Sequence, residues 1–92
     1  GAVASKYRNA GQTCVCTNRF LVQDGVYEAF AAKLKAAVAK LKVGNGLDDG
    51  VTIGPLINPD AVEKVREHIA DAVEHGASVL LGGKPDALGG NF

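Results

Sequence analysis

The two cysteines, Cys14 and Cys16, are the side chains best suited to chemistry, and they stand one residue apart in the stretch RNAGQTCVC. A Cys-x-Cys disulfide would close a very small ring, which disfavours a permanent structural bridge. A zinc or copper site needs further soft ligands, and the neighbouring sequence offers none. The spacing alone therefore leaves two interpretations: inert buried thiols, or a nucleophile with a companion.

The residues before Cys14 favour the nucleophile. Gly11, Gln12 and Thr13 are small or polar, and a glycine allows the backbone to bend sharply. A thiol at such a bend can point into a cleft while its own backbone N–H faces the reacting carbonyl. Arg8 adds positive charge that can assist a thiolate or hold an anionic substrate.

The two histidines, His68 and His75, are the other potential metal ligands. Both fall in one predicted helix, where their spacing separates them by about 10 Å along the axis. That distance is too long for one shared ion, so we interpret both as solvated helix residues and expect no metal site. A non-enzymatic module that binds metal or exchanges thiols through the Cys-x-Cys pair is the rival hypothesis.

The composition limits the class of protein. The chain has 92 residues, enough for at most one small domain, and its 10 basic and 10 acidic side chains give a net charge of zero. This balance argues against nucleic-acid and anionic-membrane partners. No apolar run is long enough to span a bilayer, and no export signal opens the sequence. With too few cysteines for a disulfide scaffold, we expect a cytoplasmic protein, or a mitochondrial one if the source is eukaryotic.

Two helices are predicted, each with recognisable ends. Residues 25–43 carry apolar side chains at three- and four-residue steps, with Asp24 as the expected N-cap and Gly44 as the stop. A second helix begins at Asn58-Pro59, where asparagine is the expected N-cap and proline occupies the first helical position; Gly76 ends it.

Short β-rich runs at residues 19–23 and 77–81 predict two strands. Helices alternating with strands indicate an α/β fold with a mainly parallel sheet. Two strands do not make such a sheet, and the chain starts without Met and ends on an aromatic residue, so we expect a piece of a larger domain. The glycine-rich connection 44–55 lacks the spacing of a phosphate-binding loop, and we predict a surface loop there.

The stretch RNAGQTCVCTNRFLVQDGVYEAF resembles the catalytic-cysteine segment of the aldehyde dehydrogenase superfamily. The Gly-Gln-x-Cys core, followed by a short polar step, an arginine and an apolar strand, is typical of that family. KYRNAGQTCVCTNR is most similar to succinate-semialdehyde dehydrogenases. VGNGLDDGVTIGPLI and SVLLGGKPDALGGNF agree as well, so the resemblance covers essentially the whole chain.

The resemblance implies roles for three residues. Cys14 matches the catalytic cysteine, whose thiolate adds to the aldehyde to give a thiohemiacetal with its oxyanion held partly by the Cys14 N–H. Hydride then passes to NAD or NADP, and water hydrolyses the resulting thioester. Arg8 matches the arginine that binds the remote carboxylate of succinic semialdehyde; a neighbouring substrate such as glutarate semialdehyde is the alternative. Cys16 matches a second cysteine that some members use as a reversible redox partner.

Other parts of the family pattern have no match here. These are the general-base glutamate, the oxyanion asparagine and the dinucleotide-binding domain. We therefore expect residues 1–92 to be a partial catalytic domain, inactive alone, within a homo-oligomeric parent. The residues that distinguish NAD from NADP lie outside this sequence.

Overall fold

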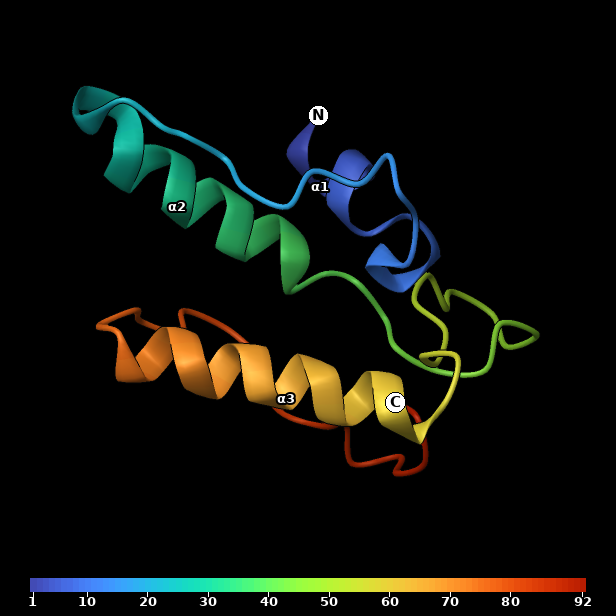
Figure 1. Ribbon diagram of the computed structural model, residues 1–92. Coiled ribbons are helices and arrows are strands. Elements are labelled where there is room, and N and C mark those ends of the chain that lie inside the picture. The colour runs from blue at the N-terminus through green and yellow to red at the C-terminus, as the bar shows by residue number, and fades with distance from the viewer.

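The computed structural model describes all of residues 1–92 and is mainly helical (Figure 1). A short helix α1 (Ala2–Lys6) leads into a 3₁₀ turn η1 (Arg8–Gly11). Two longer helices follow, α2 (Asp24–Val38) and α3 (Pro59–Glu74). The loop that contains both cysteines therefore lies between α1 and the extended segment that leads into α2.

The structure shows no β-strand, so the predicted parallel sheet is not seen within these residues. Residues 19–23 and 77–81 find no strand partner, and the only β-pairing is an isolated parallel bridge between Val43 and Ile53. A strand exists only when its backbone groups bond to a neighbour. Without one, the predicted strands leave apolar side chains in solvent, and Leu21 is 98% exposed.

Helix α2 is shorter than the predicted span 25–43, because it ends at Val38. Its expected N-cap, Asp24, is instead the first helical residue. Backbone pairing explains why the helix does not continue to residue 43. Lys42 O accepts the Ile53 N–H at 3.1 Å, beside the parallel bridge. The chain after Val38 therefore pairs with the following loop instead of continuing the helix.

The limits predicted for α3 are confirmed. Asn58 is the N-cap and its Oδ1 accepts the Ala61 N–H at 2.8 Å, while Pro59 occupies the start of the helix. Gly76 follows the C-cap His75 with φ of +95°, a left-handed conformation that glycine adopts at little cost.

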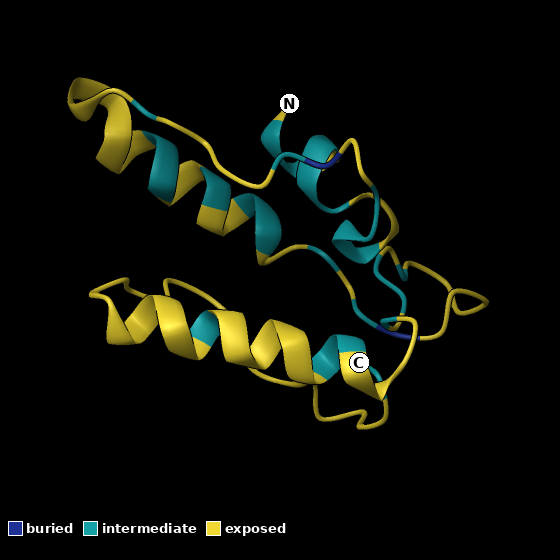
Figure 2. Cartoon of the chain, in the orientation of Figure 1, coloured by how far each residue is buried: buried dark blue, intermediate teal, exposed yellow.

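The chain has almost no interior of its own, since only Cys16 and Gly44 among its 92 residues are buried (Figure 2). Its accessible surface is 7143 Å². A folded monomer of 9.4 kDa is expected to expose roughly 5,000 Å². The described residues therefore expose far more surface than a self-contained domain of this mass. None of the helices is both long and apolar enough to cross a bilayer.

Candidate active site

Cys14 lies at the tip of a tight turn in the cysteine loop, which we define as residues 8–16. The Cys16 N–H donates to Thr13 O at 3.1 Å and closes the turn. Cys14 is a free, exposed thiol, and its own N–H donates to no acceptor in the chain. The predicted bend is confirmed three residues earlier, at Gly11, which has φ of +79°.

Cys16 has the opposite environment, with only 5% of its surface exposed. Its Sγ lies 2.6 Å from Thr13 Oγ1 and 3.7 Å from Arg8 O, which accepts the thiol hydrogen. Both cysteines are free, so the structure contains no disulfide between Cys14 and Cys16. One thiol is open to reagents, while the other holds the two sides of the cysteine loop together.

The backbone before Cys14 is left-handed over three successive residues. Asn9, Ala10 and Gly11 have φ of +50°, +55° and +79°. The bend at Gly11 was predicted, but the other two were not. A non-glycine residue in this region costs about 1–2 kcal/mol, with asparagine among the more tolerant types. Asn9 thus gave a weak signal in the sequence, and Ala10 gave none.

Arg8, the predicted carboxylate-binding residue, begins this turn and is exposed. Its guanidinium enters none of the three ion pairs in the chain, which involve Lys64, Arg66 and His75. The structure therefore brings Arg8 and Cys16 together through the Arg8 carbonyl and leaves the Arg8 side chain unpaired within these residues.

The base of the cysteine loop is closed by hydrogen bonds between α1 and the segment after Cys16. Ser5 Oγ lies 2.7 Å from Thr17 Oγ1 and also accepts the Thr17 N–H at 3.3 Å. Lys6 Nζ donates to Asn18 Oδ1 at 3.0 Å. These partners are twelve residues apart, and no local sequence pattern points to such pairs. Sequence reasoning therefore missed the closure that holds the candidate site.

The histidines take no part in this site. His68 and His75 are both exposed on or beside α3, and His75 Nδ1 lies 2.8 Å from Asp71 O. No group of three or more His, Cys, Asp or Glu side chains in the described residues is arranged to hold a metal ion.

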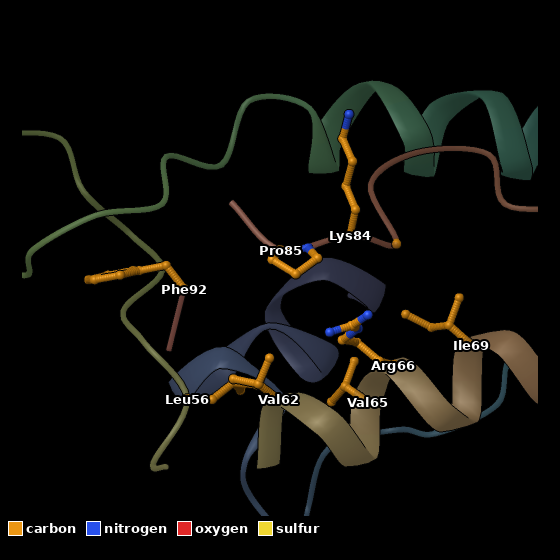
Figure 3. Close-up of a pocket in the computed structure, with 9 residues that line it drawn as sticks. Leu56, Val62, Val65, Arg66, Ile69, Lys84, Pro85 and Phe92 are labelled. Carbon is orange, nitrogen blue, oxygen red and sulfur yellow. The ribbon is translucent and has the colours of Figure 1, made fainter. Parts of the chain in front are cut away.

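Two hollows lie away from the cysteines. The first, of about 160 Å³, is formed by one face of α3 and the C-terminal segment, with Val62, Val65 and Ile69 facing Pro85 (Figure 3). A wider groove of about 690 Å³ runs between α2 and residues 78–83. Neither hollow is lined by a cysteine. Cys14 is exposed and lines neither hollow, so it lies on an open loop of this chain.

The class of protein follows from a match to a family model over the whole chain. The family model described as "Aldehyde dehydrogenase family" matches residues 1–92. The chain belongs to the aldehyde dehydrogenase family, as its cysteine segment predicted.

Among members of this family, the chain is similar to several semialdehyde dehydrogenases. The chain is 72% identical to glutarate-semialdehyde dehydrogenase of Pseudomonas aeruginosa and 68% identical to the NADP(+) succinate-semialdehyde dehydrogenase of Escherichia coli K12. Each match covers 100% of this chain and 19% of the relative. The crystal structure of succinate-semialdehyde dehydrogenase from Burkholderia pseudomallei superposes with a TM-score of 0.97 at 66% identity, over 99% of this chain and 19% of that one. The chain thus spans about a fifth of the length of these relatives.

Proposed function

We propose that residues 1–92 form the nucleophile-bearing part of the catalytic domain of an NAD(P)-dependent aldehyde dehydrogenase that oxidises succinic semialdehyde to succinate. The observation that carries the proposal is the arrangement of the cysteine loop. A free, exposed Cys14 with an uncommitted N–H shares one closed loop with an unpaired Arg8. These are the functional groups needed to attack a carbonyl at one end of a substrate and to bind a carboxylate at the other.

In the proposed chemistry, Cys14 acts twice. Its thiolate sulfur bonds to the aldehyde carbon, and the C=O electron pair moves onto oxygen to form a tetrahedral oxyanion. The Cys14 N–H, free of partners within the chain, is available to donate a hydrogen bond to that oxyanion. Arg8 supplies the fork of donors that suits the remote carboxylate of the substrate.

The dinucleotide would be held elsewhere in the enzyme. These residues contain no glycine-rich turn with the spacing of a nucleotide-binding motif, so they do not fit NAD or NADP as a binding site. We therefore expect the isolated 92-residue chain to reduce no NAD or NADP with succinic semialdehyde. An absorbance assay for the reduced nicotinamide tests this expectation, and turnover above background would contradict it.

Steady-state kinetics of the full-length enzyme test the substrate proposal. Replacing Arg8→Met removes the charge and keeps an apolar stem, so kcat/KM for succinic semialdehyde should fall roughly 10- to 100-fold, the worth of one charged hydrogen-bond pair. Butanal has no carboxylate and should lose little. Arg66→Met is the matched control, because Arg66 is an exposed arginine on α3. An equal loss with butanal would contradict the assigned role of Arg8.

A second substrate deserves a direct comparison because a relative named glutarate-semialdehyde dehydrogenase shares 72% identity with the chain. Glutaric semialdehyde has the same two functional groups, with one more methylene between them. The two substrates differ by a single methylene, which is worth about 0.8 kcal/mol of burial. The ratio of their kcat/KM values on the full-length enzyme decides between them.

We retain Cys16 as a proposed redox partner of Cys14. Peroxide would oxidise the two thiols to one disulfide and be reduced to two waters, and the product could not attack an aldehyde. The buried contacts of Cys16 with Thr13 and Arg8 must break first, which predicts slow inactivation. Peroxide-treated full-length enzyme should regain activity with dithiothreitol, and the Cys16→Ser variant should lose this reversibility. Equal recovery of both proteins would leave Cys16 without the role.

We also propose that residues 19–23 and 77–81 are strands of a mainly parallel sheet in the complete catalytic domain. Both segments line the wider groove with apolar side chains, including Phe20 and Val79, and have no strand partner within the chain. Hydrogen exchange should then be slow at both segments in the full-length enzyme and fast in the isolated chain. Fast exchange in both would contradict the sheet.

The remaining expectations concern assembly and location. We propose a cytoplasmic homo-oligomer that uses a small aldehyde substrate, with mitochondrial location as the alternative in a eukaryote. A relative from Rattus norvegicus, 60% identical, bears the name "Succinate-semialdehyde dehydrogenase, mitochondrial". Light scattering of the full-length enzyme measures its assembly, and a monomer would contradict the oligomer.

A further inference from the structure

Gln12 lies between the left-handed turn and Cys14, and its contacts cross that turn. The Gln12 N–H donates to Asn9 O at 3.1 Å, and the side-chain Nε2 donates to the same oxygen at 3.2 Å. In return, Asn9 Nδ2 donates to Gln12 O at 3.4 Å. Strained backbone persists only where its surroundings hold it in place, and these three bonds span the strained residues.

The other end of the Gln12 amide reaches a distant part of the chain. Its Oε1 accepts the Ile57 N–H at 2.9 Å, across 45 residues of sequence. Ile57 immediately precedes Asn58, the N-cap of α3. The amide thus joins the left-handed turn to the start of a regular helix, which gives the irregular turn a firm support.

The two contacts require an amide and no other group of this size. The oxygen accepts from Ile57 while the nitrogen donates to Asn9, so the side chain is a donor and an acceptor at once. An ionised glutamate at this position still accepts from Ile57 but has no hydrogen to donate. Glutamate in place of Gln12 therefore removes one specific contact with almost no change in size.

We propose that Gln12 is a positioning residue that holds Asn9, Ala10 and Gly11 left-handed and so sets the place of Arg8 relative to Cys14. Arg8 directly precedes the turn and Cys14 follows Gln12 by two residues. A change in the turn therefore moves the carboxylate-binding end of the site relative to the nucleophile. The proposal rests on the proposed function for its kinetic consequence, although the structural consequence does not depend on it.

The kinetic test uses the full-length enzyme with Gln12→Glu and Gln12→Ala. We expect kcat/KM for succinic semialdehyde to fall roughly 10- to 100-fold, as for a small misplacement of reacting groups. Butanal does not use Arg8 and should lose less, so the ratio of the two substrates falls. Gln23→Glu is the matched control, because Gln23 is exposed and its side chain makes no capping bond.

A rescue separates positioning from general damage. Ala10→Gly lets position 10 adopt its left-handed conformation without steric cost. Added to Gln12→Ala, it should restore about tenfold in kcat/KM and return the substrate ratio toward that of the parent enzyme. Failure of this rescue, or an unchanged substrate ratio in Gln12→Ala, would overturn the proposal.

A second readout does not need catalysis. The rate at which iodoacetamide alkylates Cys14 depends on the conformation of the left-handed turn. Gln12→Ala should change this rate several-fold, and adding Ala10→Gly should reverse the change. If the parent enzyme oxidises neither semialdehyde but these alkylation rates behave as expected, the proposed function fails and the positioning role stands. If the rates do not respond, the positioning role fails whatever the substrate.

Discussion

The cysteine loop and α3 are built in opposite ways from the same chain. In α3, backbone bonds between neighbouring turns define the helix, and its ion pairs join residues three or four apart, such as Lys64 with Glu67 at 3.3 Å. The cysteine loop has short-range bonds as well, such as Gln12 to Asn9, but it is also held by bonds from Ser5 to Thr17 at its base and from Gln12 to Ile57, which join residues far apart in sequence.

This difference separates what is locally determined from what is not. A helix such as α3 depends on many equivalent contacts, so the loss of one changes little. The cysteine loop keeps two non-glycine residues left-handed, and only a few side chains hold them there. We therefore expect single substitutions to have large effects in the cysteine loop and small ones in α3.

The largest effect should come from Cys14, the proposed nucleophile. In the full-length enzyme, Cys14→Ala removes the sulfur that we propose bonds to the substrate, so kcat should fall on the order of 10³-fold or more. Cys16→Ala is the matched control, since it removes the other thiol, two residues further along the chain, and should cost less than about tenfold. Reduced-nicotinamide absorbance measures both, and equal losses would contradict the assignment of Cys14.

Glycine-to-alanine changes compare the two kinds of structure directly. At Gly11, φ is +79° and a Cβ would lie 3.3 Å from Lys6 O, so Gly11→Ala should destabilise the enzyme by about 1–2 kcal/mol. At Gly25, in the first turn of α2, nothing lies within 4 Å of an added Cβ. Gly25→Ala should therefore stabilise by about 0.5–1 kcal/mol. Thermal denaturation of the two full-length variants measures this, and shifts of the same sign would refute the contrast.

Substitutions at the N-terminal end of α3 should have an effect of intermediate size on stability. Asn58→Ala removes the Oδ1 that accepts the Ala61 N–H at 2.8 Å, which should cost about 1 kcal/mol. Asn58→Asp keeps an acceptor at the same place and should cost far less. Hydrogen exchange in the first turn of α3 reports the difference, and equal exchange in both variants would show that the cap contributes nothing.

The same division, between local and distant contacts, separates the parts of the structure that the sequence predicted from those it did not. The cap at Asn58, the first-turn Pro59 and the stop at Gly76 are local signals, and all three are confirmed. The predicted end of α2 at residue 43 was wrong: the helix ends at Val38, because the parallel bridge of Val43 with Ile53 competes for the same stretch of backbone. Local propensity does not contain that competition.

The candidate site divides in the same way. Cys14, Cys16 and Arg8 could be singled out from residue type and family resemblance, and the bend at Gly11 could be predicted. The left-handed Ala10 and the link from Gln12 to Ile57 could not, since the first conformation is disfavoured for its residue type and the second contact spans 45 residues. Residue chemistry is thus readable in this sequence, whereas the contacts that position it depend on the tertiary fold.

The smallest effect should come from an exposed ion pair of α3. Lys64 and Glu67 are 3.3 Å apart with side chains 66% and 57% exposed, so solvent and salt screen their attraction. Lys64→Ala should change the opening free energy of α3 by less than about 0.5 kcal/mol. Lys6→Ala is the comparison at the base of the cysteine loop, because Lys6 Nζ bridges twelve residues to Asn18 at 3.0 Å. Hydrogen exchange of the full-length enzyme should accelerate more over residues 8–16 in Lys6→Ala than over α3 in Lys64→Ala. The reverse order would mean that the cysteine loop is held by contacts other than those between its distant segments.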